Sequence, residues 1–302
     1  MLRPVLLALA VVALGCLIGC RRAAPWQATD WRPASPPQRI VAASVLATET
    51  LLAIAPRERL AGVHVLAADA RYSLVADEAK ALPLVGADPE QLLAARPDLV
   101  VCDAFTRPET LALLAAADVP VVQTATPTSF ADIAANLRRI GAVCWLQAPA
   151  EALVAQMEQR LAALAAHAGE CASWRVASLD GALHTYGRGS LFDAMVGAAG
   201  ARHLAGERGV GPVRKLAVET VLGWQPDALV LGGADAADGE QPAWLAQQPG
   251  LALLPCAQRA RYVRIPSPLL ATTSHRLVDA AARLQDALRQ WGRPCPARSS
   301  PS

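Results

Sequence analysis

The sequence has few aromatic residues, little net charge and no clustered metal ligands. Aromatic side chains make up 4% of the 302 residues, and the formal net charge is +2. A nucleic-acid-binding surface needs a basic stripe, often interleaved with aromatic residues, and the sequence contains none. The five histidines are scattered, without clustered Asp or Glu, which argues against a bare zinc or manganese site. We therefore expect no nucleic-acid partner and no bound metal ion.

The motifs of common hydrolases and nucleotide-binding enzymes are also missing. There is no Gly-x-Ser-x-Gly nucleophile elbow, and the stretch Gly187–Gly189 lacks the Lys-Ser/Thr of a phosphate-binding loop. Ser44, His64 and Asp103 are predicted near strand ends, but nothing marks them as a nucleophile, a base and an orienting group. We predict a protein that is not an enzyme and needs no cofactor, with a secreted hydrolase as the least favoured alternative.

Five cysteines lie beyond the N-terminal segment, an odd number for an oxidising compartment. Cys144 and Cys171 stand at opposite ends of a predicted long helix, so we expect no disulfide between them. Cys102, in a predicted buried strand, is expected to act as an apolar side chain. Pairing of Cys256 with Cys295 stays open.

The first twenty residues have the pattern of a targeting segment. Arg3 gives a positive start, and the apolar run from Val5 to Leu14 is too short to span a bilayer comfortably. Leu17-Ile18-Gly19-Cys20 resembles the bacterial lipobox, in which the Cys is lipidated and becomes the mature N-terminus. Acyl chains on Cys20 would hold the protein on a membrane surface without a spanning helix. A plain membrane anchor or an uncleaved signal is the alternative.

One pattern occurs twice in the sequence. A Glu, a Pro seven residues later and an Asp directly after the Pro precede an apolar run at Glu90…Pro97-Asp98 and again at Glu219…Pro226-Asp227. The two copies are offset by 129 residues (219 − 90). A second pair, Arg39-Ile-Val-Ala and Arg175-Val-Ala-Ser, is offset by 136 (175 − 39). Internal similarity of this kind indicates two lobes of the same construction.

A long amphipathic helix is predicted between the two copies, from Pro149 to His167. Leu153, Met157 and Leu164 belong to one apolar stripe at helical spacing, and Gly169 is expected to end the helix. On either side strands alternate with helices, which predicts parallel sheets covered on both faces. The predicted fold class is α/β, with two similar Rossmann-like lobes with parallel sheets joined by one long backbone helix.

These features divide the chain into six predicted segments. They are a lipoprotein signal peptide (1–20), a Pro-rich tether (21–38), an N-terminal lobe (39–145), the backbone helix (146–170), a C-terminal lobe (171–291) and a disordered tail (292–302). The tether has four prolines and no periodicity, so we expect it to be stiff and extended. Because ligands bind at the carboxyl ends of strands in open α/β sheets, a cleft between the lobes is the expected binding site.

The order of these motifs resembles one family of transport proteins. A lipobox, Arg39-Ile-Val-Ala-Ala-Ser followed by Thr48-Glu49, the duplicated Glu…Pro-Asp segments and a central helix are similar to the helical-backbone, class III substrate-binding proteins of bacterial ABC importers. This group binds ferric siderophores, cobalamin and haem, and the resemblance covers residues 39–290. It implies a lipid-anchored monomer on the periplasmic or cell-surface face of the membrane, which delivers a metal chelate to an ABC permease dimer with its ATPase. A ligand-binding sensor or surface module without transport is the alternative.

The resemblance also implies roles for individual residues. Glu90 and Glu219 match the acidic residues, one on the upper surface of each lobe, that dock into arginines of the permease. The expected ligand-binding residues lie after strands or in the loop that begins at His184; they are His64, Tyr72, Asp103, Phe105, His184, Tyr186, Arg188 and Leu269. Arg188 would pair with an anionic ligand, and Tyr186 or His184 would stack on it or touch its metal.

The low aromatic content bears on the choice of ligand. Asp103 and Leu269 stand where a cobalamin-binding relative would carry Trp, which counts against cobalamin. Haem requires a Tyr or His ligand, and Tyr72, His184 and Tyr186 leave that possibility open. We therefore predict a ferric siderophore first, followed by cobalamin or haem.

Overall fold

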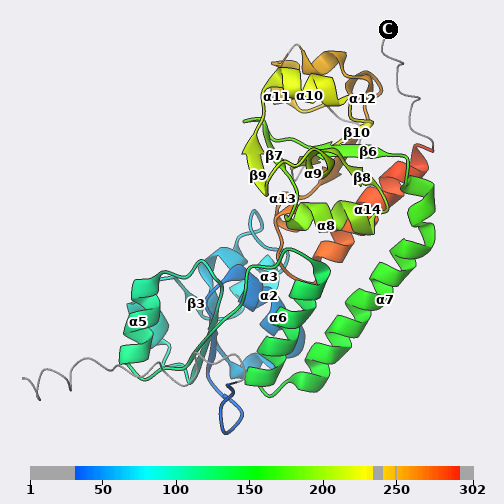
Figure 1. Cartoon of the computed structure of the whole chain (residues 1–302). Coiled ribbons are helices and arrows are strands. Elements are labelled where there is room, and N and C mark those ends of the chain that lie inside the picture. The colour runs from blue at the N-terminus through cyan, green and yellow to red at the C-terminus, as the bar shows by residue number, and fades with distance from the viewer. Residues whose placement is uncertain (1–30, 234–240, 249, 293–302) are drawn as a thin grey trace, which may run out of the picture.

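The computed structural model describes residues 31–233, 241–248 and 250–292. They form two α/β lobes, drawn one above the other in Figure 1 and connected by one long helix, α7 (Gln147–Cys171). The predicted fold class is therefore confirmed. The predicted signal peptide with Cys20 and the tail beyond Gly292 lie outside the described residues, within which no helix is long and apolar enough to cross a membrane.

The N-terminal lobe is built on a parallel sheet of five strands in the order β3-β2-β1-β4-β5. Its central strands are short and fully buried, as expected for a parallel sheet with both faces covered. The strands are β1 (Ile40–Ala42), β2 (Leu60–His64), β3 (Leu84–Val85), β4 (Leu99–Cys102) and β5 (Val121–Gln123). The helices and 3-10 turns are α2 (Val45–Ile54), η2 (Arg57–Arg59), η3 (Val65–Ala68), α3 (Ala76–Lys80), α4 (Pro89–Ala94), α5 (Pro108–Ala116) and α6 (Phe130–Val143).

The C-terminal lobe repeats this scheme with a parallel sheet of four strands in the order β11-β10-β6-β8. A separate antiparallel pair, β7 and β9, lies beside it. The strands are β6 (Arg175–Ser178), β7 (His184–Tyr186), β8 (Arg202–His203), β9 (Val213–Lys215), β10 (Ala228–Gly232) and β11 (Tyr262–Ile265). The helices and the 3-10 turn are α8 (Leu191–Ala198), α9 (Leu204–Glu207), α10 (Val218–Trp224), α11 (Ala243–Ala246), η4 (Leu251–Leu253), α12 (Pro255–Gln258), α13 (Ser267–Leu270) and α14 (Leu277–Gln290).

The two Pro-Asp motifs have the same structural role in each lobe. The carboxylate of Asp98 accepts hydrogen bonds from the backbone N–H groups of Gln38 and Arg39, at 2.6 and 3.0 Å. The carboxylate of Asp227 accepts one from the backbone N–H of Arg175 at 3.0 Å, and the Asp227 N–H donates to the Arg175 carbonyl at 2.8 Å. In both lobes this Asp joins the start of the first strand to the start of the strand beside it. The sequence repeat therefore reflects a repeated structural contact.

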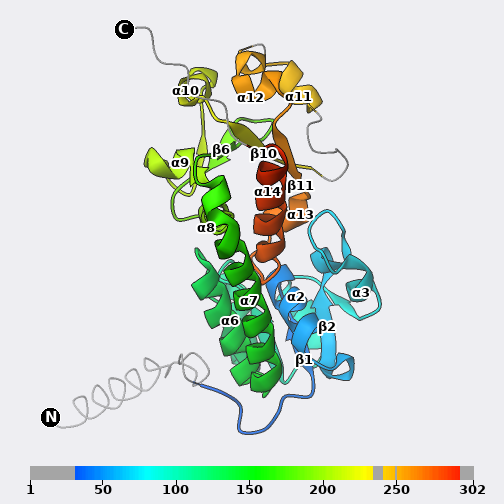
Figure 2. The same ribbon diagram turned by 90° about the vertical axis from the view of Figure 1, so that its right-hand side faces the viewer.

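The lobes are joined by more than the connecting helix. α7 packs against α6 of the N-terminal lobe and against α14 of the C-terminal lobe (Figure 2). Arg138 on α6 lies 2.9 Å from Glu151 on α7, and Arg289 on α14 lies 2.7 Å from Glu170. One buried hydrophobic cluster runs from α6 through α7 and α14 to β10 and β11. The connection is a three-helix layer with a shared core rather than an isolated rod.

The helix α7 is longer than the sequence predicted. It begins at Gln147 and ends at Cys171, so the prediction that Gly169 ends it is wrong. A Cβ on Gly169 would meet no atom within 4 Å, which places this glycine on the open side of the helix. The helix continues past it because Cys171 and the following Trp174 are fully buried in the core. Their burial outweighs the cost of about 1 kcal/mol for a glycine inside a helix.

The end of the predicted tether lies on the N-terminal lobe. Arg139 Nη1 donates to the carbonyl of Trp31 at 2.6 Å, and Trp145 Nε1 donates to the carbonyl of Pro33 at 3.1 Å. Residues 31–38 are therefore not an extended spacer, because α6 and the turn between α6 and α7 offer donors to their backbone carbonyls. The remaining predicted tether, residues 21–30, lies outside the described residues.

Four cysteines lie in the described part of the chain, and all four are buried and free. Burial raises the pKa of Cys102 to about 11 and the pKa of Cys144 and of Cys256 to about 12, so these thiols are unreactive at neutral pH. Cys144 and Cys171 form no disulfide, as predicted. Cys295 lies outside the described residues.

Candidate functional site

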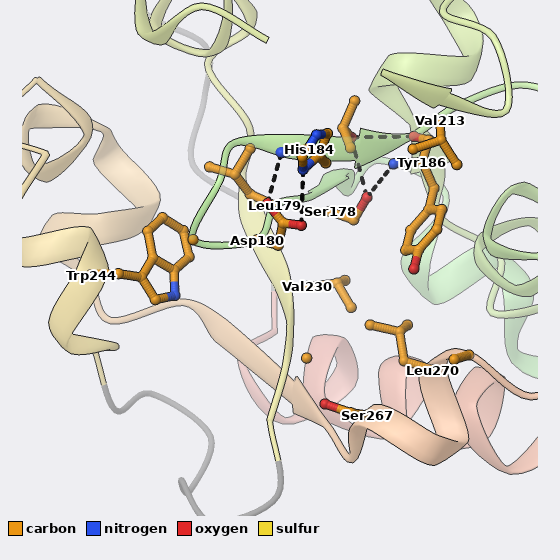
Figure 3. A pocket seen from close by; sticks show the side chains of 14 residues that line it. Ser178, Leu179, Asp180, His184, Tyr186, Val213, Val230, Trp244, Ser267 and Leu270 are labelled. Carbon is orange, nitrogen blue, oxygen red and sulfur yellow. Dashed lines mark hydrogen bonds and ion pairs between the residues drawn. The ribbon is translucent and has the colours of Figure 1, made fainter. Parts of the chain in front are cut away.

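Each lobe has a hollow where the carboxyl ends of its strands meet, as expected for an open α/β sheet. The C-terminal hollow has a volume of about 480 Å³ (Figure 3). It is lined by residues that follow β6, by residues of β10, and by residues of β7, β9, α11 and α13, the helix that follows β11. The N-terminal hollow has a volume of about 250 Å³ and is lined by residues that follow β1, β2 and β4.

Two aromatic side chains stand on opposite sides of the C-terminal hollow. Trp244 of α11 and Tyr186 of β7 flank it, and Val230 of β10 lies between them (Figure 3). Asp180 accepts a hydrogen bond from the backbone N–H of His184 at 2.8 Å and lies 3.2 Å from His184 Nδ1. The hollow thus combines aromatic faces with one carboxylate–imidazole pair.

Tyr186 is held in place by its neighbours. Its N–H donates to the Ser178 hydroxyl at 2.9 Å, and its ring stacks on Phe192 with the ring centroids 5.7 Å apart. His203 lies 3.1 Å from the Tyr186 carbonyl through Nε2 and 2.7 Å from Asp193 through Nδ1. Partial burial raises the pKa of the Tyr186 phenol above its ordinary value. This side chain is therefore a fixed, protonated phenol at neutral pH.

The N-terminal hollow brings together three of the predicted residues, His64, Asp103 and Phe105. His64 ends β2, and its Nδ1 accepts a hydrogen bond from the backbone N–H of Leu66 at 3.3 Å. Burial lowers the pKa of His64, and the charge of Asp103 partly opposes this shift. Asp103 accepts a hydrogen bond from the Phe105 N–H at 3.0 Å, and Phe105 is 77% exposed. An uncovered phenyl ring thus stands at the edge of this hollow.

Tyr72 lies on the loop between η3 and α3, which reaches toward the C-terminal lobe beside α13 (Figure 2). It is 51% exposed and lines neither hollow. The guanidinium carbon of Arg71 lies 5.5 Å from the centroid of its ring. Arg71 donates through Nε and Nη2 to Asp69, at 3.0 and 2.6 Å, and these hydrogen bonds lower the pKa of Asp69 to about 2. The loop therefore presents an open phenol beside a fixed cation.

Two predicted ligand-binding residues lie elsewhere. Leu269 is 8% exposed, packs in the hydrophobic cluster that α6, α7 and α14 share, and lines neither hollow. The helix α13 packs on α14, and its residues Ser267 and Leu270 line the C-terminal hollow. Arg188 is exposed, lines neither hollow, and donates through Nε to the carbonyl of Gly206 at 3.2 Å.

Sequence reasoning missed several lining residues, among them Asp180, Ser267, Trp244 and Arg107. Asp180 and Ser267 each lie two residues after a strand, β6 and β11. Applying the carboxyl-end rule to every predicted strand would have found both. Trp244 comes from α11, which reaches the hollow only through tertiary packing, and no local signal marks it.

The acidic residues predicted to dock lie on the surface. Glu90 and Glu219 occupy the first turns of α4 and α10, one in each lobe, and both are exposed. A carboxylate in this position is favoured by the partial positive charge of the helix N-terminus. Among the described residues no three His, Cys, Asp or Glu side chains are grouped so that they could hold a metal ion.

Comparison with known proteins agrees with this architecture. The family profile described as "Periplasmic binding protein" matches residues 40–269. A search of curated proteins gave no match. Among solved structures, the apo form of the periplasmic haem-binding protein RhuT from Roseiflexus sp. RS-1 is 27% identical, with a TM-score of 0.73 over 84% of this chain and 98% of that one. A periplasmic haem-binding protein from Pseudomonas aeruginosa is also 27% identical, with a TM-score of 0.69 over 86% and 95%.

A vitamin B12-binding protein has the same fold at lower sequence identity. BtuF of Vibrio cholerae is 21% identical, with a TM-score of 0.67 over 84% of this chain and 98% of that one, so the likeness is one of fold alone. The family profile covers most of the chain, and two parallel-sheet lobes on one helix are the architecture that the motifs predicted. The chain belongs to the periplasmic binding protein family, in its class III, Fe/B12-type group of substrate-binding proteins of ABC importers.

Proposed function

We propose that the protein binds an iron chelate between its two hollows, that this chelate is haem, and that Tyr72 is the ligand to its iron. The observation that carries the proposal is the exposed Tyr72 phenol on a loop between the lobes, with the Arg71 guanidinium 5.5 Å from its ring. Tyr is one of the side chains that hold haem iron in proteins. The Arg71 guanidinium, which Asp69 holds in place, adds a donor beside the phenol for an anionic group of the ligand.

The walls of the two hollows suit a flat, largely apolar ligand. Phe105 at the N-terminal hollow is 77% exposed, and Val213 at the C-terminal hollow is 62% exposed. Trp244 and Tyr186 add two aromatic faces (Figure 3). Uncovered apolar groups around a concave site are typical of ligand-binding surfaces. The C-terminal hollow alone, at about 480 Å³, falls in the range of about 300–1,000 Å³ of small-molecule sites.

Cations at the rim match the carboxylates of haem. Arg71 stands beside Tyr72, and Arg107 lines the N-terminal hollow. Arg107 Nη2 lies 2.9 Å from Asp88, and its side chain is 61% exposed. A guanidinium presents five donors, so each of these arginines keeps donors for a ligand carboxylate while it holds its present partner.

A ferric siderophore, which the sequence analysis placed first, is the alternative ligand. A siderophore supplies the iron ligands itself, so it would leave Tyr72 without a coordinating role. Haem needs an axial ligand from the protein. The exposed Tyr72 and the similarity to two periplasmic haem-binding proteins, each 27% identical to this chain, support haem.

An absorbance titration of the purified chain with hemin, ferric siderophores and cobalamin tests the ligand. We expect hemin to bind one to one, with the spectrum of a tyrosinate-ligated ferric haem. Tyr72→Phe should lose that spectrum and weaken binding at least about tenfold, or about 1.4 kcal/mol. Tyr262→Phe, a change at a fully buried tyrosine of β11, is the control and should keep the spectrum. Siderophore binding without hemin binding, or an unchanged spectrum in Tyr72→Phe, would overturn the proposal.

For transport, we propose that Glu90 and Glu219 dock onto an ABC permease while a lipid on Cys20 holds the monomer at the periplasmic or cell-surface face of the membrane. Both glutamates are exposed, one on each lobe, so a permease can engage both at only one lobe spacing. Changing both to Lys should stop uptake by cells and leave the hemin titration unchanged. Cys20→Ala should release soluble protein. Loss of hemin affinity in the first variant, or membrane retention of the second, counts against these roles.

A further inference from the structure

A buried carboxylate joins the two lobes next to the loop that carries Tyr72. Glu49 lies on α2 of the N-terminal lobe and is 2% exposed. It lines neither hollow and lies away from the surface, so neither ligand binding nor docking accounts for it. Removing a carboxylate from water is costly unless hydrogen bonds replace the lost hydration. The partners of Glu49 therefore show what its burial achieves.

Both oxygens of Glu49 accept hydrogen bonds, and each serves a different lobe. Oε1 accepts from the Ser73 hydroxyl and from the backbone N–H of Leu74, each at 3.2 Å. Oε2 accepts from the hydroxyls of Thr272 and Ser274, at 3.1 and 2.6 Å. The first two donors belong to the loop between η3 and α3, and the other two to the segment between α13 and α14. One side chain thus connects α2, the Tyr72 loop and the C-terminal lobe.

The Tyr72 loop depends on this connection. Ser73 directly follows Tyr72, and Leu74 also packs against the hydrophobic cluster that α6, α7 and α14 share. On the other side of the loop, the Tyr72 N–H donates to the carbonyl of Asp69 at 2.9 Å. A movement of the lobes that separates Ser274 from Glu49 would also disturb the contacts of Ser73 and Leu74. The place of Tyr72 relative to the C-terminal lobe is therefore coupled to the angle between the lobes.

We propose that Glu49 is a positioning residue, which fixes the angle between the lobes and places Tyr72 beside the C-terminal lobe before the ligand arrives. Opening this bridge would leave Oε2 of a buried carboxylate without its two donors, which disfavours other lobe angles. A site ordered in advance binds its ligand more tightly, because less ordering accompanies binding, and such differences in affinity lie mostly in the rate of release. The effect on haem rests on the proposed function, whereas the bridge itself is measured without any ligand.

Hydrogen exchange of the ligand-free full-length chain tests the bridge. Glu49→Gln keeps the shape of the side chain but removes its charge and replaces one acceptor oxygen with a donor that faces hydroxyl groups. We expect the amides of residues 71–75 and 272–276 to exchange about tenfold faster, with those of β1, β4 and β10 unchanged. Ser274→Ala should give the same pattern. Thr50→Val, a fully buried change on the same helix at a hydroxyl without a partner in the described structure, should give no change at either segment.

Two exchange results would overturn the proposal. Unchanged rates in Glu49→Gln would show that the carboxylate does not hold the lobes. Faster exchange throughout the chain would show that Glu49 supports general stability rather than the position of one loop and one segment.

Haem release tests the effect on the ligand. Transfer of haem to excess apomyoglobin should be about tenfold faster from Glu49→Gln, with the iron spectrum of the wild type because Tyr72 is still present. The double variant Glu49→Gln/Ser274→Ala should be no faster than Glu49→Gln, since both changes break the same bridge. Additive rates or an altered spectrum would overturn the positioning role. If the wild type does not bind haem, the proposed ligand is wrong, and the exchange experiment still decides the role of Glu49.

Discussion

Asp98 and Asp227 hold equivalent positions in the two lobes, yet their removal should have unequal effects. Asp227 is 7% exposed and accepts three hydrogen bonds from Arg175, through the backbone N–H at 3.0 Å, Nε at 2.9 Å and Nη2 at 3.0 Å. Asp98 is exposed and accepts only backbone N–H groups, those of Gln38 and Arg39. The guanidinium of Arg39 donates instead to two backbone carbonyls.

The magnitudes follow from burial and charge. Asp227→Ala leaves the guanidinium of Arg175, whose side chain is 23% exposed, without its carboxylate. Removing one partner of a buried ion pair costs about 3–5 kcal/mol. Because Arg175 is partly hydrated, we expect Asp227→Ala to lower the free energy of unfolding by about 3 kcal/mol. Asp98→Ala removes two hydrogen bonds at an exposed site, where water replaces the carboxylate, and should cost about 1 kcal/mol.

Thermal unfolding followed by tryptophan fluorescence measures the difference. At about 2–3 °C per kcal/mol for a chain of this size, Asp227→Ala should lower Tm by about 6–9 °C and Asp98→Ala by about 2–3 °C. Asp227→Asn keeps the shape of the side chain and should fall between them. Equal shifts, or a larger shift for Asp98→Ala, would refute the assignment of the larger energy to the buried ion pair.

Stability should also depend on two histidines and one helix crossing. Burial lowers the pKa of His64 and of His275 below the ordinary 6.5, so the unfolded chain takes up protons first as the pH falls. The free energy of unfolding should decline below about pH 6.5, by at most about 1.4 kcal/mol per pH unit for each histidine. His275→Gln should flatten the dependence of the urea midpoint on pH, and a steeper dependence on pH would contradict this account. A Cβ on Gly141 of α6 would lie 2.4 Å from the Cβ of Ala150 on α7, so Gly141→Ala should cost about 1–3 kcal/mol and lower Tm. Gly223→Ala, where a Cβ meets nothing within 4 Å, should not lower Tm, and equal losses in both variants would contradict the crowding argument.

The two-lobe fold could be predicted because its signals are local or repeated. The fully apolar run Leu99–Cys102 forms a buried strand, and the Glu of each repeat begins a short helix. The repeated Asp has a repeated role, since it ties two neighbouring strands together at their starts. Each of these contacts joins residues of a single lobe, so it can be inferred without knowing how the two lobes pack together.

His184 and Tyr186 were predicted from the resemblance of their loop, and other residues that line a hollow were predicted because they end or directly follow a strand. His64 and Asp103 were found for that reason, and both line the N-terminal hollow. Leu269 is buried and the next residue, Leu270, lines the hollow; the sequence of a four-residue helix has too few turns to show which side faces the core. Glu49 was noticed as part of a motif, but its partner Ser274 lies 225 residues further along the chain. Only tertiary packing brings such a pair together.

The hydrophobic cluster that runs from α6 through α7 to α14 makes neither half of the chain complete on its own. A chimera that takes one lobe from a different parent would bring together helix faces that have never been matched, and cavities or clashes in this layer are costly. Exchange of rim segments alone leaves the layer intact. Engineering of new cargo preferences in this scaffold should therefore graft loops at the mouths of the hollows and keep all three helices from a single parent.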